Sequence, residues 1–179
     1  MINVYIQKWN KENESWQNIF SDILKRNYSI EEMPKVLKDE YGKPYFENGQ
    51  LQFNVSHSGE FLAIAVSESR VGVDIQAPKT IKEGMYKKIV QPEEQKLIGD
   101  NRQADFLRLW TLKESFVKAE GKGLRIPLKD YWFEKENDQY FVNYGGQRAC
   151  WTFNIEETLI EDYFISVCGL DKNVQWKIV

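Results

Sequence analysis

The 179-residue chain is poor in the two residue types that build zinc sites and disulfide frameworks. It has one histidine and two cysteines, which excludes a zinc site held by the usual set of four histidine and cysteine ligands. Cys150 and Cys168 both lie in strand-like segments. We therefore expect two buried thiols that act as small hydrophobic side chains in a reducing cytoplasm.

A large charge of one sign and long apolar runs are also missing. The net charge of −3 gives no basic surface for nucleic acid. The longest apolar run, residues 61–66, is too short to cross a bilayer. The first residues lack the basic-then-apolar layout of a signal peptide. We expect a cytoplasmic monomer that has neither a membrane nor a nucleic acid as partner.

What the chain does contain is the composition of a globular protein, with 42% hydrophobic and 14% aromatic residues. Apolar periodicity indicates a strand–helix–strands pattern that recurs twice, and this favours two similar halves that meet near residue 78. Strands are expected at 3–9, 36–38, 44–46, 51–56, 61–67, 71–75, 131–134, 140–144, 150–154, 164–168 and 174–179. Helices are expected at 15–27, at 85–98 with an interruption at Pro92, and from about residue 105.

The helix that starts near residue 105 is apolar on two sides, and Glu114 lies in the middle of one apolar line. A carboxylate buried there without a partner costs several kcal/mol or takes up a proton, so a cation must meet it. Lys118, one turn later, is the nearest candidate. An ordinary Glu–Lys pair at a solvated edge gives the same pattern. Gly121 is expected to end the helix as a left-handed cap.

Two strand residues and Glu114 can form an oxygen site for a cation. Asp74 and Gln76 are two residues apart on one strand, so their side chains point the same way. With Glu114 they supply the carboxylate and amide oxygens that magnesium takes. A solvent-exposed polar strand face is the alternative explanation for Asp74 and Gln76.

Two further clusters suit phosphate. The segment 56–58 (SHS) ends a strand, and His57 is a candidate base, phosphate donor or ordinary loop residue. The end of the buried helix offers ammonium groups and free backbone N–H groups from Lys113, Lys118, Lys122, Gly121 and Gly123. A solvated basic helix end is the alternative there. Together the three clusters favour magnesium-assisted phosphate chemistry.

Three ordered motifs carry a resemblance to a known family. They are residues 53–59 (FNVSHSG), 72–76 (GVDIQ) and 110–118 (WTLKESFVK), flanked by 41–44 (YGKP) and 121–127 (GKGLRIP). In this order and spacing they resemble the signature of the Sfp-type 4'-phosphopantetheinyl transferases. The resemblance runs from about residue 40 to 131 and continues loosely to the C-terminus.

The resemblance implies both a fold and an activity. The fold would be α+β, with two pseudo-symmetric halves at 1–77 and 78–179, each a small antiparallel sheet packed on a long helix, and the site between them. The activity would be magnesium-dependent transfer of 4'-phosphopantetheine from coenzyme A to a serine of an apo carrier protein. Acyl- and peptidyl-carrier proteins of fatty acid, polyketide or nonribosomal peptide synthesis are the implied partners.

The resemblance also implies a role for each site residue. Asp74 and Glu114 would hold Mg²⁺, and Gln76 would coordinate it directly or through a water. Glu114 would also take the proton of the carrier serine, and Lys118 would neutralise the transferring phosphate. The coenzyme A contacts would be His57 and Lys113 at the phosphates, with Ser56 and Lys43 near the 3'-phosphate and adenine.

Two departures from the family pattern keep other functions open. Gln76 stands where many members have a second acid. The short N-terminal segment leaves Lys8 and Lys11 as candidates to grip the nucleotide. The alternatives are a catalytically weak coenzyme A-binding or carrier-docking module and a magnesium-dependent phosphohydrolase.

The segment 121–131 is a candidate dock for the carrier, because an apolar patch with a basic rim suits an acidic partner. The apolar residues would be Leu124, Ile126 and Leu128, and the basic ones Lys122, Arg125 and Lys129. The alternative is that these aliphatic side chains complete the core.

Overall fold

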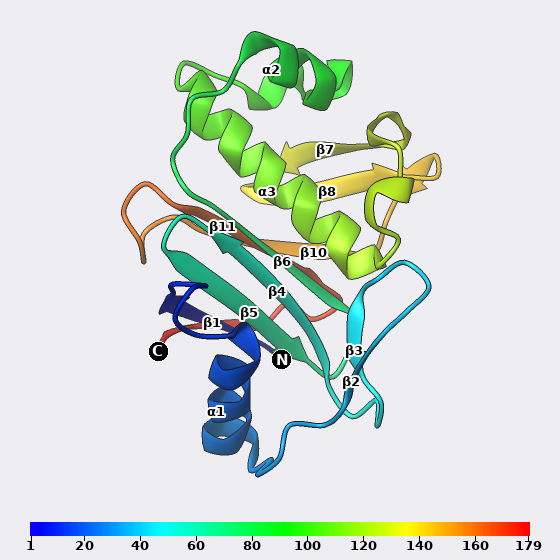
Figure 1. The fold of residues 1–179 in the computed structure, drawn as a ribbon. Coiled ribbons are helices and arrows are strands. Elements are labelled where there is room, and N and C mark those ends of the chain that lie inside the picture. The colour runs from blue at the N-terminus through cyan, green and yellow to red at the C-terminus, as the bar shows by residue number, and fades with distance from the viewer.

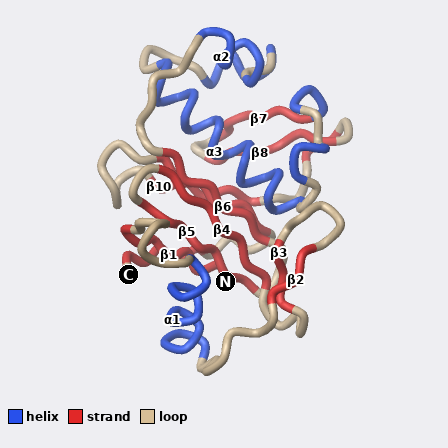
Figure 2. The backbone as a smooth tube through the Cα atoms, viewed as in Figure 1, coloured by secondary structure: helices blue, strands red, loops and turns tan.

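The computed structural model of the protein describes residues 1–179, apart from the side chain of Leu124. The fold is α+β, as predicted, with two sheets packed face to face between two helices (Figure 1). Figure 2 shows the same layers, with α1 and α3 on opposite sides of the strands. The helices are α1 (Trp16–Tyr28), α2 (Glu83–Ile89) and α3 (Arg102–Glu120). No helix among the described residues is both long and apolar enough to cross a membrane.

The first sheet has the strand order β12-β1-β5-β4. Its strands are β1 (Ile2–Lys8), β4 (Gln52–Ser58), β5 (Phe61–Ser67) and β12 (Val174–Ile178). The pairing of β1 with β12 is parallel, so this sheet is not purely antiparallel as expected. Both faces of β5 are buried, because Leu62, Ile64 and Val66 pack with α1 while Ala63 and Ala65 pack against the second sheet.

The second sheet is antiparallel, with the order β10-β11-β6. Its strands are β6 (Val71–Gln76), β10 (Thr152–Glu156) and β11 (Phe164–Gly169). The predicted alternation of β6 is confirmed, since Val71, Val73 and Ile75 lie in the core between the sheets. Gly72 and Asp74 consequently face α3.

Smaller elements complete the two ends of the molecule. Next to α3 lies a three-stranded sheet of β7 (Tyr131–Glu136), β8 (Gln139–Tyr144) and β9 (Gln147–Arg148). A hairpin of β2 (Val36–Lys38) and β3 (Pro44–Phe46) precedes β4. The predicted helix 85–98 is divided into α2 and a 3₁₀ segment (Pro92–Leu97), because proline at the start of the second piece cannot continue α2.

The sheet pairings cross the predicted boundary between residues 77 and 78. Strand β6 pairs with β11, and β12 pairs with β1, so both ends of the chain lie at the first sheet (Figure 1). The division into pseudo-symmetric halves 1–77 and 78–179 stays a prediction. The β12-β1-β5-β4 sheet and the β10-β11-β6 sheet each contain strands from both sides of that boundary.

The two thiols differ in their exposure to solvent. Cys168 is buried in β11, as predicted, and its burial raises the pKa of its thiol. Cys150 is exposed, so the prediction of a second buried thiol is wrong. The reason is local, because the neighbouring Trp151 fills the core position instead.

Candidate active site

Asp74 is the centre of a hydrogen-bonded cluster between β6 and α3. Its side chain is buried, and its Oδ1 accepts hydrogen bonds from Lys118 Nζ at 2.6 Å and Ser56 Oγ at 2.8 Å. Its Oδ2 accepts a hydrogen bond from Gln76 Nε2 at 2.8 Å. The ammonium of Lys118 also donates to the Val73 carbonyl at 3.1 Å. This buried carboxylate is therefore fully hydrogen-bonded, as a buried charge requires.

Glu114 lies one turn before Lys118 on α3 and is partly buried. Burial raises the pKa of Glu114, and the negative charge of Asp74 raises it further, while Lys118 and Lys79 act in the opposite direction. The expected ion pair of Glu114 with Lys118 is not formed, because Lys118 pairs with Asp74 instead. Two carboxylates thus share one site, and the raised pKa of Glu114 makes its carboxylate a better proton acceptor than an ordinary glutamate.

Side chains of β4, rather than its main chain, accept hydrogen bonds from the backbone of β6 and so link the two sheets. Asn54 Oδ1 accepts a hydrogen bond from the Val73 N–H at 2.9 Å, and Ser58 Oγ accepts one from the Ala77 N–H at 2.9 Å. Between them, Ser56 Oγ accepts from the Ile75 N–H at 3.4 Å. The alternation of residues 54, 56 and 58 turns all three towards β6. This polar ladder fixes β6, and with it Asp74, against the first sheet.

Ser56 and Lys43 lie in places that differ from the predicted coenzyme A contacts. Ser56 is buried, and its hydroxyl is bonded to Asp74, Lys118 and Ile75. Lys43 Nζ donates to the carbonyls of Val71 at 3.3 Å and Ala119 at 3.2 Å, which joins β6 to the end of α3. Burial lowers the pKa of Lys43 to about 8. Both side chains hold the site together from within.

Lys113 is also turned inward, away from the predicted phosphate contact. It is fully buried, and its Nζ lies 2.7 Å from Glu94 Oε1, an ion-pair distance without the angle of a hydrogen bond. The ring of Tyr131 lies 4.7 Å from the same ammonium. The Glu94 carboxylate also accepts hydrogen bonds from the backbone N–H groups of Gln91 and Phe133. Burial lowers the pKa of Lys113 and raises that of Glu94. The pair joins α3 to the 3₁₀ segment Pro92–Leu97, and the bond from the Phe133 N–H links Glu94 to β7.

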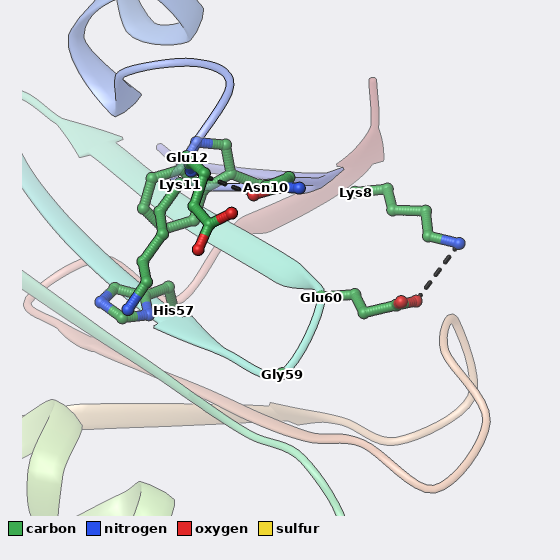
Figure 3. Close-up of a pocket in the computed structure, with 8 residues that line it drawn as sticks. Lys8, Asn10, Lys11, Glu12, His57, Gly59 and Glu60 are labelled. Atoms are coloured by element: carbon green, nitrogen blue, oxygen red, sulfur yellow. Dashed lines mark hydrogen bonds and ion pairs between the residues drawn. The ribbon is translucent and has the colours of Figure 1, made fainter.

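His57 points to the opposite side of β4 from Ser56 and lines a cleft of about 770 Å³ (Figure 3). Its ring meets the ring of Trp9 edge-on, with centroids 5.2 Å apart. The side chain of Lys11 reaches towards His57 (Figure 3). Lys8 lines the same cleft and forms an ion pair with Glu60 at 3.2 Å. The same cleft is thus lined by His57, Lys8 and Lys11, which are three of the residues predicted to contact the phosphates or the nucleotide.

A second, smaller hollow of about 200 Å³ lies on the other side of the polar ladder. It is lined by the turn at 41–44, the end of α3 and Asn54, and it includes Lys118. The end of α3 is confirmed as predicted, since Gly121 has φ of 80° and caps the helix in the left-handed conformation.

The segment 121–131 differs from the predicted carrier dock. Ile126 is buried in the core, and Leu128 packs against the same core; the side chain of Leu124 lies outside the described residues. Arg125 is exposed, with its guanidinium 4.9 Å from the ring centre of Tyr41. The aliphatic side chains of Ile126 and Leu128 therefore complete the core, and the basic rim remains.

The carboxylates of Asp74 and Glu114 are the kind of donor that a hard cation takes, whereas the amide oxygen of Gln76 accepts a hydrogen bond from Lys79. Within the part of the chain that the structure describes, no three His, Cys, Asp or Glu side chains are close enough together to hold a metal ion. Asp74 and Glu114 are nevertheless near enough for the charge of Asp74 to raise the pKa of Glu114, and a pair of carboxylates is the kind of protein ligand that magnesium takes. Mg²⁺ usually takes one or two protein carboxylates and fills its remaining positions with phosphate and water.

Several residues of the site were not recognised in the sequence. Asn54 belongs to the polar ladder, Lys79 contacts Gln76, and Glu94 pairs with Lys113. The polar residues at alternating positions 54, 56 and 58 were a signal for the ladder. The partners of Gln76 and Lys113 had no such signal, because they depend on how α3 and the following loops pack.

Comparison with known proteins gives one consistent family. Residues 70–168 match the family model described as the 4'-phosphopantetheinyl transferase superfamily. The chain is 31% identical over 171 residues to the 4'-phosphopantetheinyl transferase gsp of Aneurinibacillus migulanus, covering 90% of this chain and 71% of that protein. It is 34% identical over 115 residues to the 4'-phosphopantetheinyl transferase Sfp of Bacillus subtilis strain 168, covering 61% of this chain and 51% of that relative.

A solved structure is also similar over part of the chain. The holo-[acyl-carrier-protein] synthase of Thermotoga maritima aligns with a TM-score of 0.46 and 21% sequence identity. The alignment covers 57% of this chain and 63% of the synthase.

Proposed function

This chain belongs to the 4'-phosphopantetheinyl transferase superfamily, and we propose that it transfers 4'-phosphopantetheine from coenzyme A to a serine of an apo carrier protein. The observation that carries the proposal is the cluster of Asp74, Lys118 and Glu114 between β6 and α3. Phosphoryl transfer depends on positioning and charge neutralisation more than on covalent chemistry, and this cluster supplies both. The resemblance of the three motifs to this family is confirmed by the comparisons.

In the proposed reaction, the carrier serine oxygen forms a bond to the phosphorus that bears pantetheine. The bond from that phosphorus to the bridging oxygen breaks, and adenosine 3',5'-bisphosphate leaves with the electron pair. The serine proton goes to the Glu114 carboxylate, directly or through a water. Lys118 neutralises charge on the transferring phosphate, while Asp74 and Ser56 hold its ammonium in place.

We propose that the nucleotide end of coenzyme A binds in the cleft at His57. The support is the lining of that cleft, which includes Lys8, Lys11, His57 and the indole of Trp9. Glu12 and Glu60 line it as well, and Glu60 pairs with Lys8, which leaves Lys11 and His57 as the principal phosphate donors. Ammonium groups and imidazole N–H groups donate hydrogen bonds to phosphate. Lys43, Ser56 and Lys113 are left out of this contact, because their polar groups are bonded inside the protein.

We propose Asp74 and Glu114 as the residues that hold magnesium. When bound, Mg²⁺ neutralises charge that develops on the pyrophosphate oxygens. Asp74 is positioned by β6 and Glu114 by α3, so the packing of this helix on this strand determines whether both carboxylates reach the same ion.

The partner is proposed to be an acyl- or peptidyl-carrier protein of fatty acid, polyketide or nonribosomal peptide synthesis. An acidic carrier surface would suit the basic side chains exposed in the segment after α3, which are Lys122, Arg125 and Lys129. The protein is proposed to act as a monomer in the cytoplasm, where coenzyme A and apo carriers are available. The absence of a nucleic-acid or membrane partner stays a prediction.

The experiment is to incubate the protein with coenzyme A, Mg²⁺ and an apo carrier, and to measure the intact mass of the carrier. Transfer adds the mass of one phosphopantetheine group. Cleavage of coenzyme A without a change in carrier mass would instead indicate a phosphohydrolase. Binding of coenzyme A without either reaction would indicate a binding or docking module.

A further inference from the structure

We propose, resting on the transferase function above, that Lys79 is a positioning residue of the metal site that keeps Gln76 away from the metal. Lys79 Nζ donates a hydrogen bond to Gln76 Oε1 at 2.6 Å. Gln76 Nε2 in turn donates to Asp74 Oδ2 at 2.8 Å. Gln76 therefore bridges a cation and a carboxylate, and its carbonyl oxygen is directed at Lys79.

The orientation of the Gln76 amide follows from the charges on its two sides. A side-chain amide has donors on its nitrogen and acceptors on its oxygen. Turning the amide over would place Oε1 against the Asp74 carboxylate and the NH₂ group against the Lys79 ammonium. Both new contacts would be repulsive, so Lys79 and Asp74 together hold one orientation.

This orientation changes the role that the sequence predicted for Gln76. A metal can bind an amide only through its oxygen, and Lys79 occupies that oxygen. Lys79 also brings a second positive charge to the site. Asp74 and Glu114 are thus balanced by Lys118 and Lys79 before any metal arrives. Lys79 thereby lowers the affinity of the site for divalent cations. Gln76 orients Asp74 through its hydrogen bond to Oδ2.

The test measures binding of Mn²⁺, as a probe for Mg²⁺, by electron paramagnetic resonance in the absence of coenzyme A and carrier. Lys79→Gln removes the ammonium that holds the Gln76 oxygen, and with it one positive charge, so Mn²⁺ should bind roughly tenfold more tightly than to the natural protein. Lys82→Gln is the matched control, because Lys82 is an exposed lysine three residues further along the same loop. It should change the affinity by less than about twofold.

A second pair of variants shows whether Lys79 acts through the amide. In a Gln76→Ala background, Lys79→Gln should tighten Mn²⁺ binding by no more than about threefold, because only the through-space effect of the charge remains. An unchanged affinity in Lys79→Gln overturns the proposal, as does equal tightening in both backgrounds. Undetectable Mn²⁺ binding in every variant overturns it as well, since the freed oxygen then creates no site. Failure of transfer in the carrier-mass experiment with these binding results intact would count against the proposed function alone.

Discussion

Gly72 in β6 faces the backbone carbonyl of Ser115 in α3 so closely that a methyl group on Gly72 would lie 2.1 Å from that oxygen. The same methyl group would lie 2.4 Å from the backbone nitrogen of Ala119. The missing side chain therefore allows α3 to approach β6 directly. Asp74 follows two residues later on the same face, and this close approach brings its carboxylate within 2.6 Å of Lys118 Nζ.

Gly72→Ala should lower the free energy of unfolding by about 3 kcal/mol, because the methyl group meets backbone atoms that cannot rotate away. Urea unfolding followed by circular dichroism measures the loss. Gly84→Ala in α2 is the control, since no atom lies within 4 Å of a methyl group there. It should be neutral or stabilise the protein by up to about 1 kcal/mol. Equal effects of the two substitutions would contradict the packing argument.

Lys43 should make the stability of the protein depend on pH. Burial, reinforced by Arg70, lowers the pKa of Lys43 from the ordinary 10.5 to about 8 in the folded protein. Between these two values the unfolded chain holds a proton on Lys43 that the folded protein has lost. The free energy of unfolding should therefore rise as pH increases from about 8 to 10.

The measurement is urea unfolding at several pH values from 7 to 10 for the natural protein and for Lys43→Met. The substitution removes the titrating group, so the rise across this pH window should be smaller in the variant. Identical pH dependence in the two proteins would show that Lys43 keeps an ordinary pKa in the folded state.

The cleft at His57 should control the KM for coenzyme A. Lys11→Gln and His57→Ala each remove a group that binds phosphate in the proposal, so each should raise this KM roughly tenfold and leave the KM for the carrier unchanged. The effect of Lys11→Gln should shrink as salt rises, because exposed charges are screened over about 10 Å at 0.1 M ionic strength. Lys87→Gln, on the exposed surface of α2, is the control. A change in the carrier KM alone would place the nucleotide elsewhere.

The sequence alone predicted which face of β6 carries Asp74, because the alternation of side chains along a strand depends only on the local pattern. It was also sufficient for the buried strand at 61–67 and for the end of α3 at Gly121. The coenzyme A contacts of Ser56, Lys43 and Lys113 stay predictions, and the sequence did not reveal that the polar groups of these residues have partners inside the protein. Those partners come from distant segments, such as Glu94 for Lys113, and no local pattern encodes a contact between separate elements.

The central claim is that Asp74 organises the charged groups that carry out transfer, and Asp74→Asn tests it most directly. This substitution keeps the shape of the side chain and removes the charge that holds Lys118 and, in the proposal, magnesium. The measurement is the initial rate at which an apo carrier gains mass with coenzyme A and Mg²⁺, alongside circular dichroism of the variant. We expect a native spectrum and a rate reduced well over tenfold. A folded Asp74→Asn variant that keeps more than about a tenth of the natural rate would contradict the central claim.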